Sequence, residues 1–216
     1  MIATAELEAH ERLEMLRVGR VLLDSGLTVS NDGNFSVRLD AQRILITPAG
    51  LCKGRLNAED LLILGVADGA VLAAAAGRRP SSETNIHLEV YRRFPQVGAV
   101  IHAHSPFVSA LAITGTPFPD DVLPEVVLTL GDVPTTRLAT PNTQDYLDAV
   151  TELVAGHVAI VLNHHGAMTV GPDLETALIA LERMEHSAHV YWLARGFGSV
   201  ERLSPGMVEE LRAQRH

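Results

Sequence analysis

Residues 96–105 read Gln-Val-Gly-Ala-Val-Ile-His-Ala-His-Ser, and the two histidines near the end of this stretch are the most informative feature of the chain. Val and Ile favour strands, in which successive side chains point to opposite faces, so His102 and His104 share one face. Zinc–nitrogen bonds are about 2.0–2.1 Å long, so two neighbouring imidazoles can bind one ion. The pair therefore indicates a metal site; the simpler alternative is a strand that ends in polar residues at the surface.

The composition suits a globular chain with a substantial core. Of the 216 residues, 47% are hydrophobic and 20% are charged, which is compatible with one domain or two small ones. The net charge of −9 and the lack of a Lys/Arg run argue against nucleic-acid binding. Cys52 is the only cysteine, so we expect no intrachain disulfide and a cytoplasmic location. Neither a signal peptide nor an apolar run of roughly 18 residues is present, so no membrane association is expected.

Helices and short strands are interspersed along the chain without a regular βαβ repeat. Apolar periodicity, caps and prolines predict helices over residues 5–25, 80–93, 106–113, 143–156 and 174–196, and one that begins at 205. Runs rich in β-formers predict strands over 35–39, 43–47, 61–66, 70–73, 97–103, 158–163 and 167–170. Shorter β-like pieces are expected at 126–130 and 135–138, within the proline-rich segment 116–141. The hairpin at 35–47 favours an α/β fold in the broad sense: a single three-layer α/β/α domain around a mainly antiparallel sheet.

A metal site on His102 and His104 needs a third ligand. His164 and His165 follow the apolar strand 158–163, so one of them can converge on the first pair. Three imidazoles with an open position are typical of catalytic rather than structural zinc sites. The alternative is an ordinary polar junction between a strand and a turn.

Glu83 lies at a predicted helix start, where Ser81 or Ser82 is a suitable cap. A carboxylate beside a metal can serve as ligand or general base, whereas an isolated Glu in a first turn usually complements the helix dipole. His87 lies four residues on, on the same helix face, where such pairs are usually ordinary surface pairs. The longest predicted helix carries a second candidate metal cluster, more simply explained as a solvated face: Glu182, His186 and His189.

Three short segments of small residues can approach an anion closely: Asp32-Gly33-Asn34, Ala49-Gly50 and Ser81-Ser82. Glycine permits close backbone approach, and the N-terminus of a helix offers free N–H groups. Together the segments can form a neutral phosphate cradle, although each alone is an ordinary turn.

Taken in order, these motifs resemble the class II aldolase/adducin family, which includes L-fuculose-1-phosphate aldolase and L-ribulose-5-phosphate 4-epimerase. The matching motifs are Asp-Gly-Asn-Phe-Ser (32–36), Ile-Thr-Pro-Ala-Gly (46–50), Ser-Ser-Glu (81–83), His-Ala-His (102–104) and Asn-His-His-Gly (163–166). The similarity spans residues 10–195 approximately. No single motif is specific, but the set is.

The resemblance implies one class II aldolase/adducin-like domain over residues 1–216, usually assembled as a homotetramer. It implies Zn²⁺, or another divalent ion such as Mn²⁺ or Co²⁺, on His102, His104 and His165, because the family's third ligand directly precedes the glycine. Glu83 matches the acid/base glutamate, which can also ligate the metal when no substrate is bound. The implied phosphate pocket consists of Gly33, Asn34, Gly50, Ser81 and Ser82.

The reaction implied first is reversible retro-aldol cleavage of a small ketose phosphate to an aldehyde through a metal-bound enediolate. The metal polarises the substrate oxygens and stabilises the developing charge, and Glu83 moves the proton. A 4-epimerase, a dehydratase or a decarboxylase of the same family would share this site. A non-catalytic adducin-type interaction module is the alternative outside enzymes, but such a scaffold has no need of three histidines and Glu83.

Two features depart from the family pattern. Ala49 stands where the family has Thr or Ser, so one phosphate donor is missing, although Lys53 and Arg55 follow closely. The family's fuculose-phosphate-type aldolases also use one tyrosine from a neighbouring subunit and one near the C-terminus. This chain has three tyrosines, none of which lies in 116–141 or after residue 196: Tyr91, Tyr146 and Tyr191. The sequence therefore leaves open which reaction and sugar apply, and whether phosphate is required.

Overall fold

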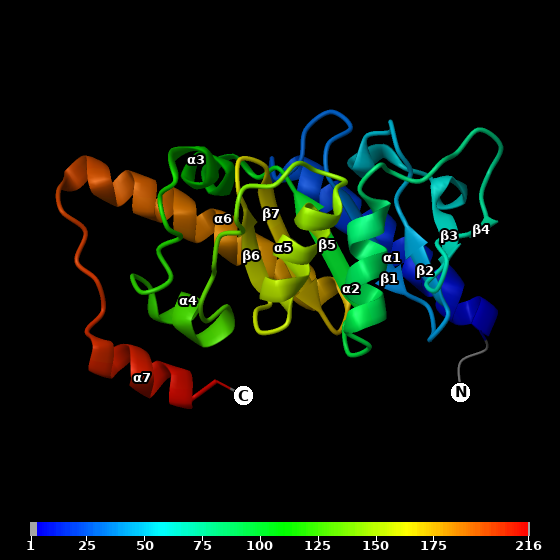
Figure 1. The fold of residues 1–216 in the computed structure, drawn as a ribbon. Coiled ribbons are helices and arrows are strands. Elements are labelled where there is room, and N and C mark those ends of the chain that lie inside the picture. The colour runs from blue at the N-terminus through cyan, green and yellow to red at the C-terminus, as the bar shows by residue number, and fades with distance from the viewer. Residues whose placement is uncertain (1–3, 216) are drawn as a thin grey trace.

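The computed structural model describes residues 4–215, which contain one seven-stranded antiparallel sheet (Figure 1). Its strands run in the spatial order β4-β3-β2-β1-β5-β7-β6, and every neighbouring pair is antiparallel. The strands are β1 (Asn34–Arg38), β2 (Arg43–Ile46), β3 (Leu62–Gly65), β4 (Val71–Ala73), β5 (Ala99–Ala103), β6 (Ala159–Leu162) and β7 (Gly166–Gly171). The expected antiparallel sheet is confirmed.

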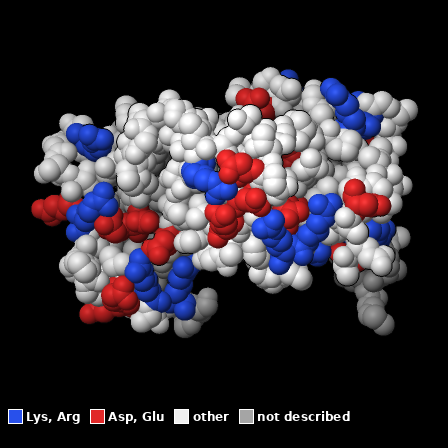
Figure 2. Space-filling model, viewed as in Figure 1, with Lys and Arg blue, Asp and Glu red and all other residues white. Residues whose placement is uncertain are grey.

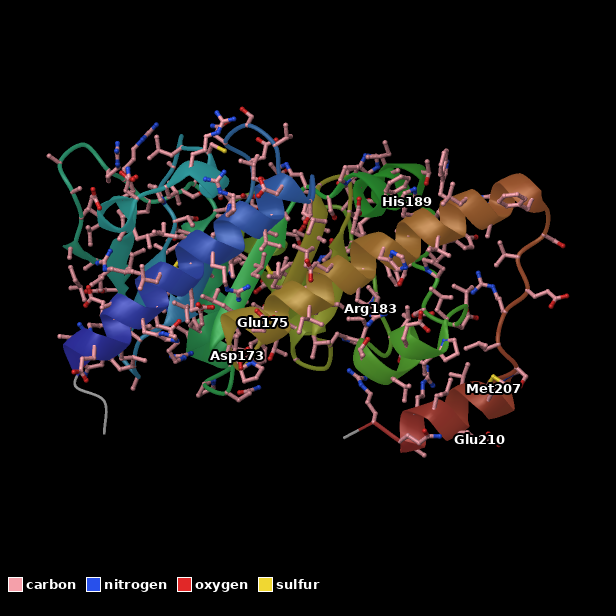
Figure 3. All side chains as sticks on the ribbon, turned by 180° about the vertical axis from the view of Figure 1, so that it is seen from behind. Asp173, Glu175, Arg183, His189, Met207 and Glu210 are labelled. Carbon is pink, nitrogen blue, oxygen red and sulfur yellow. The ribbon has the colours of Figure 1, made fainter. Side chains whose placement is uncertain are left out.

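Helices cover both faces of this sheet. The helices within the described residues are α1 (Thr4–Asp24), α2 (Thr84–Arg93), α3 (Pro106–Thr114), α4 (Pro124–Thr129), α5 (Gln144–Val154), α6 (Leu174–Phe197) and α7 (Pro205–Ala213), with short 3₁₀ turns at Lys53–Arg55 and Ala58–Asp60. In Figure 1, α2 and α5 lie in front of the sheet, and Figure 3 shows α1 and α6 covering the back. This is the expected three-layer α/β/α arrangement, and it buries apolar side chains on both faces.

The central strand β5 contributes side chains to both hydrophobic cores, one on each face of the sheet. Ala99, Ile101 and Ala103 pack toward the helices behind the sheet, whereas Val100 packs toward α2 and α5. His102 follows the parity of Val100 and therefore lies on the α2/α5 face, at the end of the strand. A strand buried on both faces explains why this stretch is almost continuously apolar.

The strand register brings distant motifs to one end of the sheet. Asn34, the first residue of β1, pairs with His102 near the end of β5, and His102 also pairs with Met168 on β7. The β6–β7 turn, which carries His165, begins after Leu162 at this same end, where Leu162 pairs with Gly166. Three motifs that are far apart in sequence thus lie on adjacent strands.

The prediction of β-like pieces at 126–130 and 135–138 was wrong. Residues 124–129 form the short helix α4, in which Pro124 occupies the first turn and Val126 and Val127 are buried. Two adjacent valines favour a strand locally, but Pro at a helix start and packing of α4 against α6 and α7 override that preference. Thr135 only bridges Val161 of β6. The boundary of α2 also differs, since it begins at Thr84 with Glu83 as the residue before it.

The surface is charged but finely mixed on the face that Figure 2 shows, where acidic and basic side chains lie next to one another. Arg93 pairs with Asp148 across α2 and α5, and Arg137 pairs with both Asp145 and Glu152. On the back of the molecule Arg17 of α1 pairs with Glu175, labelled in Figure 3. None of the helices within residues 4–215 is long and apolar enough to cross a membrane.

Candidate metal and catalytic site

Three imidazoles converge at the end of β5, beside the turn between β6 and β7. Nε2 of His102 lies 3.1 Å from Nε2 of His104, and the ring of His165 lies 4.6 Å and 4.8 Å from those two rings. One ring nitrogen from each residue falls within 4.8 Å of the others. Within residues 4–215 this is the one cluster of three or more metal-type ligands that can share an ion.

Within the β6–β7 turn, the side chains of the adjacent residues His164 and His165 point in different directions. His164 has a backbone φ of 56°, in the left-handed region that few residues with a side chain adopt, and its side chain is exposed. His165 donates its backbone N–H to the carbonyl of Leu162 and faces the other two histidines. A Cβ on Gly166 would lie 2.4 Å from the carbonyl oxygen of Ala103, so only glycine lets the turn come this close to β5.

The outer nitrogens of two rings are held by neighbours. Nδ1 of His102 lies 2.9 Å from the carbonyl oxygen of Ala167, which only accepts, so this nitrogen carries the proton and Nε2 keeps its lone pair. Nδ1 of His165 lies 3.1 Å from the hydroxyl oxygen of Tyr146. Such outer contacts orient the imidazoles of metal sites.

Glu83 completes the cluster from the start of α2. One carboxylate oxygen lies 3.2 Å from Nε2 of His165, and the other lies 3.5 Å from Nε2 of His102 and accepts a 2.7 Å hydrogen bond from Nδ2 of Asn34. Burial by itself raises the pKa of Glu83, but His102, His165 and the Asn34 hydrogen bond outweigh it and hold the pKa below its usual value.

The residues fit a divalent ion. Burial lowers the pKa of His102 to about 4, against the opposing effect of Glu83, and burial also lowers the pKa of His165. Both rings are therefore neutral near pH 7, which is the form that binds metal. Three imidazoles and one carboxylate are a donor set that zinc and other first-row ions accept.

The candidate phosphate-binding loops lie next to one another. Pro48 bridges Pro80, and the backbone N–H of Ala49 donates to the carbonyl of Arg79, so the 49–50 loop lies beside the loop that leads to Ser81 and Ser82. The third loop lies very close to β5: a Cβ on Gly33 would lie 2.8 Å from the carbonyl oxygen of His102. The side chain of Asn34 is bonded to Glu83 rather than left free.

Lys53 links two of these loops. Its ammonium group donates to the carbonyl of Asn31, before the Gly33 loop, and to the carbonyl of Leu51, after the Gly50 loop. The residue is only 3% exposed, and burial lowers the pKa of its amine. Arg55, the other cation considered from the sequence, is exposed.

Two residues that pattern reasoning did not assign a role belong to the site. Tyr146 lies on α5, nineteen residues before its partner His165, and no local pattern relates the two. His87 is fully buried instead of forming a surface pair with Glu83, and its Nε2 lies 2.5 Å from Oδ1 of Asn34. The position of His87 on the same helix face as Glu83 was visible in the sequence, but its burial was not.

The candidate second cluster on the long helix does not form. His189, labelled in Figure 3, stacks on Phe107 of α3 with ring centroids 3.9 Å apart, and Glu182 and His186 are exposed. On the same helix Glu185 accepts hydrogen bonds from the backbone N–H groups of Phe107 and Val108, at the start of α3. Glu185 therefore anchors the segment that follows His104.

Known proteins and one protein family resemble this chain over most of its length. The model of the class II aldolase and adducin N-terminal domain matches residues 13–192. The 3-oxo-tetronate 4-phosphate decarboxylase of Escherichia coli K12 is 31% identical over 213 residues, which cover 97% of this chain and 98% of the relative. The 5-deoxy-D-ribulose 1-phosphate aldolase of Bacillus thuringiensis is 30% identical over 205 residues, 93% of each chain.

Among solved structures, YgbL from Escherichia coli superposes with a TM-score of 0.87 at 29% identity, over 95% of this chain and 99% of that one. The family-model match over residues 13–192 includes both β5 and the β6–β7 turn, so the cluster of imidazoles lies within the part of the chain that the family model covers. The protein is a member of the class II aldolase and adducin family.

Proposed function

We propose that the protein is a divalent-metal-dependent carbon–carbon lyase that acts on a small phosphorylated keto sugar or keto sugar acid. The observation that carries this proposal is the position of Glu83, whose carboxylate oxygens lie 3.2 Å and 3.5 Å from the Nε2 atoms of His165 and His102. A scaffold protein has no use for a largely buried carboxylate aimed at a cluster of imidazoles, because each buried polar group opposes folding unless it is paired.

We assign metal binding, proton transfer and phosphate binding to different residues of the chain. The proposed metal ligands are His102, His104 and His165, and a divalent ion held there would act as a Lewis acid toward the substrate's carbonyl and hydroxyl oxygens. Glu83 would move the proton at the carbon next to the carbonyl, and it can ligate the ion when substrate is absent. The phosphate would lie against Gly33, Asn34, Gly50, Ser81 and Ser82, near the ammonium group of Lys53.

Decarboxylation is the reaction we favour, which differs from the aldol cleavage that the sequence suggested first. Retro-aldol cleavage needs a base for the hydroxyl of the departing aldehyde, whereas a carboxylate leaves as carbon dioxide without giving up a proton. Each of the described tyrosines already has another role in this structure: Tyr91 bonds Ser36 in the core, the Tyr146 hydroxyl contacts Nδ1 of His165, and Tyr191 lines a cavity beside α3. Similarity to 3-oxo-tetronate 4-phosphate decarboxylases over nearly the whole chain supports the same choice.

Aldol cleavage remains the second candidate, because an aldolase is 30% identical over 93% of this chain. Both reactions pass through an enediolate, and both return a proton to carbon through Glu83. The test is to incubate the Zn²⁺-loaded protein separately with a 3-oxo-tetronate 4-phosphate and with ketose 1-phosphates, and to measure carbon dioxide and aldehyde. Carbon dioxide release that is lost in Glu83→Gln supports the proposal. Aldehyde release alone selects the aldolase, and neither product from metal-loaded protein refutes lyase activity.

Four further properties belong to this proposal. We propose Zn²⁺ as the ion, with Mn²⁺ or Co²⁺ as functional substitutes, since imidazole and carboxylate ligands accept all three. We propose that the chain acts as one class II aldolase/adducin-like domain and assembles as a homotetramer. We also propose a cytoplasmic location, which is supported by the single free cysteine, Cys52.

A further inference from the structure

A chain of hydrogen bonds runs from Glu83 into the core between β1 and α2. Nδ2 of Asn34 donates to Glu83, and Oδ1 of Asn34 lies 2.5 Å from Nε2 of His87. On the far side of the ring, Oγ of Ser36 lies 2.7 Å from Nδ1 of His87, and the hydroxyl of Tyr91 lies 2.9 Å from that Oγ. Asn34, Ser36, His87 and Tyr91 are each 2% exposed or less.

The chemistry of the groups determines the direction of these bonds. An ionised carboxylate only accepts, so Asn34 presents its NH₂ group to Glu83 and its carbonyl to His87. Nε2 of His87 must then carry the proton, and Nδ1 must accept from the hydroxyl of Ser36. The opposite direction would place the carbonyl of Asn34 against the carboxylate of Glu83, where two acceptors repel.

His87 is suited to hold a group in place rather than to exchange protons. Burial, with a smaller contribution from His102, lowers its pKa to about 3, so the ring is neutral across the physiological range. The two hydrogen-bond partners of its ring are Asn34 and Ser36. A satisfied, buried network of this kind restricts its members to one arrangement.

We propose that His87 is a positioning residue that acts through Asn34: it fixes the Asn34 amide with its NH₂ group toward Glu83, and so keeps the carboxylate aimed at the three-histidine cluster. The family resemblance assigned Asn34 to the phosphate pocket. In this proposal its amide donates one N–H to Glu83 and keeps the second N–H for an oxygen of the substrate. The inference rests on the proposed function insofar as Glu83 is the proton-transfer group.

The first test needs neither substrate nor metal. Two-bond ¹⁵N–¹H correlation spectra of the metal-free protein, assigned with His87→Gln, report which ring nitrogen of His87 carries the proton. We expect protonated Nε2 and unprotonated Nδ1. The opposite tautomer would overturn the proposal even if the protein proves to be a lyase, because Asn34 would then have to turn its carbonyl toward Glu83.

The second test compares two replacements of His87 that differ in which bond they keep. The amide nitrogen of Gln can occupy the place of Nε2 and still donate to Asn34, whereas Asn is too short for Asn34 but can still accept from Ser36. We expect His87→Asn to lower kcat by about 10- to 100-fold, as for other partners that orient catalytic groups, with KM and metal content unchanged. His87→Gln should recover most of kcat.

Thr169→Val is the matched control, because it removes a different buried hydrogen bond, from Thr169 to the carbonyl of Ala177 on α6. It should lower Tm without lowering kcat. If kcat falls in both His87 variants in proportion to their loss of Tm, the role of His87 is structural and the proposal fails. A wild-type protein without any turnover refutes the proposed function, whereas the tautomer measurement still decides the role of His87.

Discussion

The hydroxyl oxygen of Tyr146 lies 3.1 Å from Nδ1 of His165, and this contact joins the first turn of α5 to the imidazole that closes the three-histidine cluster. Tyr146 is only 5% exposed, and burial raises the pKa of its phenol well above the usual value. The hydroxyl therefore stays protonated, and it acts as a neutral partner for the outer nitrogen of His165.

Tyr146→Phe should weaken metal binding while leaving the fold intact. The change removes one oxygen atom that orients His165, and losses of such partners reduce metal affinity or activity by about 10- to 100-fold. Competition with a chromophoric chelator measures the affinity, and the visible spectrum of the Co²⁺-loaded protein reports altered ligand geometry. Tyr191→Phe, on α6, is the matched control and should bind metal as the wild type does. Equal affinities for the wild type and Tyr146→Phe would show that the contact does not orient a ligand.

Replacing His102, His104 or His165 by Ala should abolish metal binding of about one ion per chain, because each supplies one nitrogen of the cluster. His164→Asn is the control for the adjacent position. Asn tolerates the left-handed conformation of His164 better than Ala does, so this change leaves the turn undisturbed. Elemental analysis after dialysis checks the ion count. Full metal occupancy in His165→Ala would exclude His165 as the third ligand.

Glu83→Gln should keep the metal and the fold but stop proton transfer. A positioned acid/base contributes roughly 10²- to 10⁴-fold, and the amide of Gln cannot exchange a proton with carbon. The measurement is incorporation of deuterium from heavy water into a ketone substrate, followed by NMR. Glu182→Gln, an exposed change on α6, should leave the exchange rate unaltered. Wild-type exchange in Glu83→Gln would mean that another group is the base.

Ala49→Ser should tighten binding of a phosphorylated enediolate analogue. A hydrogen bond to a charged group contributes about 1.5–3 kcal/mol, which corresponds to roughly a ten- to hundredfold change in affinity. The backbone N–H of Ala49 donates to the carbonyl of Arg79, in the loop that leads to Ser81. A serine hydroxyl at position 49 can therefore reach the phosphate proposed to bind at Ser81. Calorimetric titration with the phosphorylated and unphosphorylated analogues checks the prediction. A wild type that prefers the unphosphorylated substrate would contradict a phosphate pocket in these loops.

We expect the protein to be a homotetramer at micromolar concentration. The C-terminal half of α6 presents large apolar side chains to solvent in the isolated chain, including Trp192, Leu193 and the 94% exposed Phe197. Burying such groups between subunits removes apolar surface from water. Light scattering coupled to gel filtration measures the mass, and Phe197→Asp should shift it downward if this surface lies in an interface. A monomeric wild type would refute the expectation.

Much of the fold was predictable because local patterns report which way a side chain faces and where an element ends. The predicted helices at 5–25 and 174–196 correspond closely to α1 and α6, where apolar periodicity and the Asp173 cap act within a few residues. The β-like piece predicted at 126–130 was wrong: its two valines favour a strand locally, but packing against α6 and α7 stabilises the helix α4 there.

The sequence by itself determined that His102 and His104 share a face, since the two-residue repeat of a strand requires it, and motif order pointed to Glu83 and His165. Only the tertiary structure decided which outer contacts hold them. The direction of His164 depends on the sign of one φ angle in a tight turn, and the contacts of Tyr146 with His165 and of His87 with Asn34 join elements from distant parts of the chain. Such contacts depend on sheet order and helix placement, which no local periodicity encodes.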